Sequence, residues 1–142
     1  MSASSELFLA THRQASDYAR GKGAAPEHRA ELGEVSDLDL EILGTLAAQT
    51  VHAQGVETEL GLVDIDLDNL LVVPDAVTEI WAELGVLEDP EDFTELAARW
   101  AATEELDTTT ELAEGWLRQI SRLASQVIAA DESARVALYF VQ

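Results

Sequence analysis

The chain has 142 residues, of which 47% are apolar and none is cysteine, so a core can form, whereas disulfides, thiolate catalysis and cysteine-ligated metal sites are excluded. Its 28 acidic residues outnumber 8 basic ones, and the net charge of −20 argues against binding to nucleic acid or to an anionic membrane surface. No apolar run approaches the roughly 20 residues of a membrane span, so we expect a cytoplasmic protein with a single domain over residues 1–142.

Two short apolar segments at the ends of the chain are predicted to be neighbouring strands. Residues 7–11 read as a short buried strand, and residues 136–141 are apolar and of strongly β-forming type. Neither segment can be buried alone, and chain ends often lie close together in a compact domain. We therefore expect the two strands to pair in one sheet.

The segment from residue 12 to residue 26 has no clear apolar period. Its glycines, proline and polar residues predict a loop, although residues 14–20 are compatible with two helical turns. A helix is then predicted to begin at Ser36, because Ser36 and Asp39 have the spacing of a capping box. Leu38, Ile42 and Leu46 are expected to form its buried face.

Residues 63–68 alternate between apolar residues and aspartate, which predicts a strand with one acidic face. Three carboxylates on one face cannot be buried unpaired, so this strand should lie at an edge of the sheet or face solvent. We expect Asp68 and Asn69 to turn the chain into a second strand over residues 70–73.

The same acidic segment also partly matches a calcium-binding loop. Asp64, Asp66, Asp68 and Asp75 have the spacing of oxygen ligands in an EF-hand. Position six of that loop, however, is Asn69 instead of glycine, and two of the intervening residues are apolar where polar ones are usual. We favour the acidic strand and expect neither a metal site nor a cofactor.

Three helices are predicted before the last strand. Pro74 begins the first, with Gly85 as its stop; Asp89 and Pro90 begin the second; Thr108 and Glu111 form a capping box for the third. The apolar stripe of the third helix is expected to comprise Leu112, Trp116, Ile120, Leu123 and Val127, widened by Ala113, Leu117, Ala124 and Ile128. Each helix carries one tryptophan in its apolar stripe, and these should form a core cluster: Trp81, Trp100 and Trp116.

The order of elements predicts an α+β fold. It comprises a small sheet, including the paired N- and C-terminal strands, covered on one face by about four to five helices.

The N-terminal segment is the candidate ligand-binding region, although we favour a solvated loop whose cations pair with the acidic remainder of the chain. Residues 1–30 carry a net charge of +1, whereas the remainder of the chain carries −21. This segment contains most of the groups that are able to bind an anion or to move a proton near pH 7. We take four of its residues as candidate ligand-binding residues: His12, Arg13, Arg20 and Lys22.

No catalytic signature is present in the sequence, and no residue is assigned a catalytic role. Our leading hypothesis is therefore a small acidic, non-enzymatic module that binds a protein partner or regulates it. A homodimer is also possible. The alternative is a small-ligand-binding protein or an enzyme that uses the cationic segment over residues 12–29.

Overall fold

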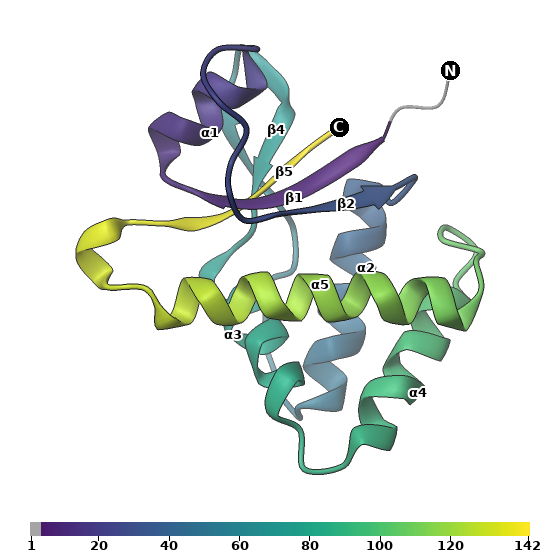
Figure 1. Ribbon diagram of the computed structural model, residues 1–142. Helices are drawn as coiled ribbons and strands as arrows, with labels where there is room; N and C mark the ends of the chain where they lie inside the picture. The colour runs from purple at the N-terminus through teal and green to yellow at the C-terminus, as the bar shows by residue number, and fades with distance from the viewer. Residues whose placement is uncertain (1–3) are drawn as a thin grey trace.

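The computed structural model of the protein describes residues 4–142, which form an α+β fold as predicted (Figure 1). The described strands build one five-stranded antiparallel sheet in the order β2-β1-β5-β4-β3. They are β1 (Ser5–Ala10), β2 (Arg29–Gly33), β3 (Gly61–Asp64), β4 (Leu67–Val72) and β5 (Ala137–Val141). The α-helices are α1 (His12–Ala19), α2 (Asp37–Thr50), α3 (Asp75–Glu83), α4 (Pro90–Ala101) and α5 (Thr110–Ala129).

The two ends of the chain meet at the centre of the sheet. β1 pairs with β5 in an antiparallel register that runs from Glu6 opposite Val141 to Ala10 opposite Ala137. β5 also pairs with β4 on its other side, so the last strand in the sequence is the middle strand of the sheet. The predicted pairing of the terminal segments is confirmed.

Helices cover both faces of the sheet, which corrects the prediction that they pack on one face. Leu7, Leu138 and Phe140 point toward α2, α3, α4 and α5, which build the larger core. On the opposite face, Phe8 and Tyr139 form a smaller cluster with residues of α1. The prediction failed because α1 is short and mostly polar, and its buried residues are Ala15 and Ser16, which do not form a recognisable apolar stripe in the sequence.

The N-terminal third contains two elements that the sequence reading missed or only partly identified. α1 begins at His12, where Thr11 and Gln14 form a capping box that replaces the predicted loop. β2 follows the intervening turn and pairs with β1 at the edge of the sheet. Its alternation of exposed and buried residues rests on only two buried side chains, those of Ala30 and Leu32.

The acidic segment forms a hairpin whose turn differs from the predicted one. β3 ends at Asp64 and β4 begins at Leu67, so Ile65 and Asp66 form the turn. The Oδ1 atom of Asp64 accepts a hydrogen bond of 2.9 Å from the backbone N–H of Asp66, an interaction that favours a turn here. The predicted strand over residues 63–68 is therefore wrong, and so is the predicted turn at residues 68–69. β3 nevertheless lies at an edge of the sheet.

The predicted helix starts are mostly confirmed, but the buried face of α2 is rotated. Ser36 and Asp39 form the expected capping box of α2, and Asp89 caps α4. The buried face of α2 contains Leu40, Leu43 and Ala47, whereas Leu38 is 45% exposed. The cap of α5 is Thr109 in place of Thr108. In its predicted stripe Ala113, Leu117, Ile120, Leu123 and Ala124 are buried, whereas Leu112 and Ile128 are 48% and 52% exposed.

Gly85 does not end α3 in the predicted way. The chain continues from α3 into a short 3-10 helix, η1 (Leu84–Val86). A Cβ atom at position 85 would lie 3.1 Å from the Oγ atom of Ser121, so the glycine allows η1 to approach α5 closely. Gly85 and Ser121 both line the groove that lies between α5 and the segment formed by η1 and the first part of α4.

The three tryptophans belong to one core cluster, as predicted, but they are not equally buried. Trp81 and Trp100 are fully buried, whereas Trp116 is half-buried. The rings of Trp100 and Trp116 meet edge to face with centroids 6.3 Å apart. The indole N–H of Trp100 donates a hydrogen bond of 3.0 Å to the backbone carbonyl of Asp39. Trp100 thereby joins α4 to the first turn of α2.

Candidate functional site

The four candidate residues of the N-terminal segment are not gathered into one site. His12 and Arg13 are exposed in the first turn of α1. Arg20 follows the helix and forms an ion pair of 3.2 Å with Asp64 of β3. Of these four, Lys22 alone lines the adjacent hollow that the described residues form. Ligand binding by these residues stays a prediction.

That hollow, with a volume of about 390 Å³, lies between α1 and the loop that follows it. Its ionisable lining residues comprise Asp17, Lys22, Glu27 and His28. With the histidine neutral, two carboxylates outweigh one ammonium group, so the hollow has no cationic character. The charge of this hollow therefore does not favour binding of an anion, which is the kind of ligand predicted for the N-terminal segment.

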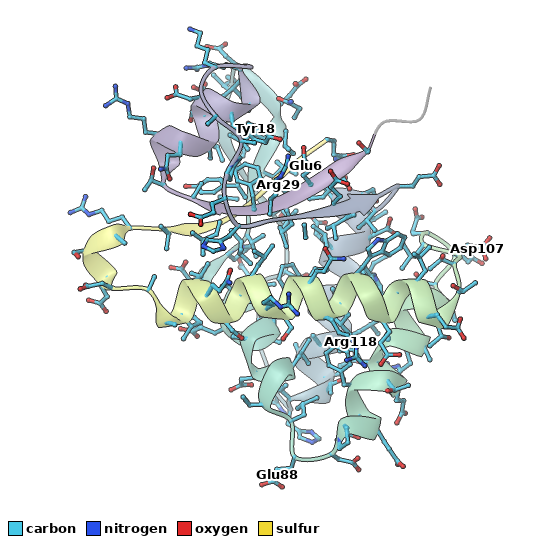
Figure 2. The ribbon with its side chains drawn as sticks, viewed as in Figure 1. Glu6, Tyr18, Arg29, Glu88, Asp107 and Arg118 are labelled. Carbon is cyan, nitrogen blue, oxygen red and sulfur yellow. The ribbon has the colours of Figure 1, made fainter. Side chains whose placement is uncertain are left out.

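Within the N-terminal segment, Glu6, Tyr18 and Arg29 form a cluster that joins β1, α1 and β2 (Figure 2). The phenol of Tyr18 donates to Glu6 across 2.9 Å, and the guanidinium of Arg29 donates to the same carboxylate across 3.1 Å. The Tyr18 ring also packs edge to face on Phe8 with centroids 5.3 Å apart. The cluster attaches α1 to β1 and β2, which makes it a structural connection.

Burial raises the pKa of the Tyr18 phenol, and Glu6 raises it further, while Arg29 acts in the opposite direction. Burial also raises the pKa of Tyr139. When folding raises the pKa of a tyrosine, the neutral phenol stabilises the folded protein. This stabilisation is fully present below the pKa of the unfolded chain, near 10.0, and is lost as the pH rises through the pKa of the folded protein. We therefore expect the free energy of unfolding to fall as the pH increases above about 10.

Urea unfolding at several pH values tests this dependence, with Tyr18→Phe expected to flatten it. The chain has only 2 tyrosines, so the phenolate absorbance of the folded protein reports on Tyr18 and Tyr139 alone. Tyr139→Phe isolates the Tyr18 titration in the same measurement. A midpoint for Tyr18 at or below 10.0 in the folded protein would contradict the expected shift.

The aspartates of the partial calcium-loop match are distributed over a hairpin and a helix. Asp64 ends β3, Asp66 is in the turn, Asp68 is on β4 and Asp75 begins α3. Residues 4–142 contain no group of three or more histidine, aspartate or glutamate side chains placed to hold a metal ion. Over the same residues, no helix is both long and apolar enough to cross a membrane.

An exposed acidic surface surrounds α4. Between residues 88 and 111 there are nine acidic residues against one basic residue, Arg99. All nine are exposed: Glu88, Asp89, Glu91, Asp92, Glu95, Glu104, Glu105, Asp107 and Glu111. Glu88 and Asp107, labelled in Figure 2, lie before and after α4. We call these nine residues the α4 acidic surface.

A groove of about 530 Å³ lies between α5 and the segment formed by η1 and the first part of α4. One side is apolar and includes Leu84, Leu87 and Phe93. The other side carries polar residues of α5: Arg118, Ser121, Arg122 and Ser125. The sequence reading missed this groove; the available signal was the i, i+3, i+4, i+7 spacing of these four residues, which places them on one helix face.

Comparison of the chain with family models, with curated proteins and with solved structures finds no match.

Proposed function

We propose that the protein is a non-enzymatic binding module whose α4 acidic surface recognises a basic protein partner. The observation that carries this proposal is the concentration of nine exposed carboxylates within residues 88–111, with only Arg99 to offset them. That segment contains nearly a third of the 28 acidic residues of the chain. A surface of one sign attracts a partner of the opposite sign and speeds the encounter.

The charges of this surface are not neutralised by ion pairs with other residues that the structure describes. None of the ion pairs formed among residues 4–142 involves any of the nine carboxylates. Arg99 donates instead to the side-chain carbonyl of Gln49 across 2.9 Å. The carboxylates therefore remain available to cationic groups of another molecule.

Part of this surface is held on a rigid element. Glu91, Asp92 and Glu95 are on α4, whose opposite side is buried in the core through Leu96, Ala97 and Trp100. At these three positions a partner would meet a pre-formed array of charges, and little conformational entropy would be lost in ordering the backbone beneath it. The alternative function at residues 12–29 has weaker support, because two of its cations, Arg20 and Arg29, are already paired with carboxylates.

The test compares two variants that lose the same amount of charge. The surface variant replaces carboxylates that do not lie in the first turn of α4, so that its helix dipole is undisturbed: Glu88→Gln, Glu95→Gln, Glu104→Gln and Glu105→Gln. The control variant neutralises exposed carboxylates elsewhere: Glu31→Gln, Glu34→Gln, Glu57→Gln and Glu59→Gln.

Each immobilised protein is used to capture partners from the source cells at low salt, and captured proteins are then measured individually. We expect a basic partner whose association rate is lowered about tenfold or more by the surface variant and much less by the control. The rate with the unmodified protein should fall steeply as salt increases. Equal losses with the two variants would show that only the total charge matters and would contradict a specific acidic recognition surface.

A further inference from the structure

The groove between α4 and α5 contains two of the few cations that follow the N-terminal segment. Beyond residue 30 the sequence contains four basic residues, and two of them, Arg118 and Arg122, line this one groove. The α4 acidic surface contributes none of its nine carboxylates to the lining, and the one acidic lining residue is Glu114. The groove is therefore locally cationic on a strongly acidic molecule.

Arg118, labelled in Figure 2, contacts both sides of the groove. Its guanidinium donates to Glu114 across 2.7 Å and lies over the ring of Phe93 on α4, 5.7 Å from the ring centroid. A guanidinium has five N–H donors, so a bond to one carboxylate oxygen leaves others for a ligand. These contacts hold Arg118 at the groove and lower the entropy that a bound group would cost by ordering it.

The remaining polar groups form a row of donors on the same helix face. Arg122 is exposed and forms no ion pair with any described residue. The hydroxyl-bearing residues Ser121 and Ser125 lie beside it at the close approach made by Gly85. Opposite this row, Leu84, Leu87 and Phe93 offer apolar surface. The groove thus presents hydrogen-bond donors and positive charge on one side and apolar contacts on the other.

We propose that this groove binds a small amphipathic anion, a carboxylate joined to an apolar group. The carboxylate accepts hydrogen bonds from Arg122, from the free donors of Arg118 and from the serine hydroxyls, since planar guanidinium groups match carboxylates well. The apolar group packs on Phe93 and the leucines. The volume of about 530 Å³ is within the range of small-molecule sites. This binding is separate from recognition of a basic protein, and either can fail without the other.

Phenylbutyrate is a suitable probe because it has one carboxylate, one aromatic ring and no other functional group. Its matched controls are phenylbutanol, which has the same apolar part without charge, and phenylbutylamine, which has the opposite charge. Titration followed by backbone amide NMR gives both the affinity and the position. We expect saturable shifts confined to α4, η1 and α5, with the acid binding about tenfold more tightly than the alcohol and the amine more weakly than either.

Two variants and one control test the assigned residues. Arg122→Gln should weaken phenylbutyrate binding about fivefold to tenfold, because it removes a charged donor from an exposed position. Ser125→Leu should abolish binding by filling the groove, and its exposed position makes the substitution compatible with folding. Arg13→Gln removes the same charge from α1, outside the groove lining, and should leave the affinity unchanged.

Equal affinities for the acid and the alcohol would overturn the proposal, as would saturable shifts located elsewhere in the protein. The same conclusion would follow if Arg122→Gln and Arg13→Gln weakened binding equally, because the effect would then report only the net charge. Absence of any saturable binding of phenylbutyrate would also overturn it.

Discussion

Replacing Trp100 with alanine is expected to lower the free energy of unfolding by about 3–5 kcal/mol. The Trp100 side chain is fully buried at the junction of α4 with α2, and its removal leaves a cavity that the surrounding helices cannot fill. The substitution also leaves the backbone carbonyl of Asp39 without its indole donor. Urea unfolding of the two proteins, followed by circular dichroism, measures the difference.

Trp116→Ala is the matched control, because it removes the same side chain from the neighbouring position. Trp116 is half-buried, so less apolar surface is lost and solvent can enter the space. We expect its cost to be well below that of Trp100→Ala. A change of less than about 1 kcal/mol for Trp100→Ala would contradict the central role assigned to this residue.

The chain-end strands could be predicted from sequence because each is a continuous run of apolar residues that must be covered on both faces. β2 could not, because only Ala30 and Leu32 of its five residues are buried. Its position depends on pairing with β1, and pairing between distant segments is not visible in local periodicity.

The helix starts were predictable because caps are local, whereas the buried faces depend on tertiary packing. α2 is apolar on more than one side: Leu38, Ile42 and Leu46 form one possible stripe, and Leu40, Leu43 and Ala47 form another. The second stripe is buried in the larger core, and on this side of α2 Gly44 lies close to the side chains of Thr58 and Val77. Such a close approach depends on which later segments of the chain pack against α2. The sequence alone therefore did not distinguish between the two stripes as the buried face.

The candidate sites show the same division between local and tertiary information. The acidic surface follows from composition, because its nine carboxylates are close together in the sequence. The groove does not follow from composition, because Arg118 and Arg122 form a site only when the fold places Phe93 and Leu87 opposite them. In the N-terminal segment the sequence reading found the cations but not their partners, since Asp64 lies 44 residues from Arg20.

Deletion of residues 137–142 is expected to abolish folding, which is the largest effect that the structure predicts for a short truncation. Chain ends normally tolerate the loss of a few residues because few contacts hold them. Here the deletion removes the central strand, and β1 and β4 both lose a hydrogen-bonding neighbour. The expected result is a protein with the far-ultraviolet circular dichroism of an unfolded chain, whereas deletion of Gln142 alone should leave the native spectrum, because Gln142 is exposed and lies beyond β5.

The size of the effect follows from the side chains that β5 buries. Leu138 and Phe140 are fully buried and Tyr139 is 5% exposed. Burial of each such side chain contributes about 2 kcal/mol, and the three together therefore approach the roughly 5–15 kcal/mol by which domains of this kind are stable. Loss of two strand pairings adds to this cost. A truncated protein that still unfolds cooperatively would show that the two remaining halves of the sheet, β1 with β2 and β3 with β4, are held by the helices alone.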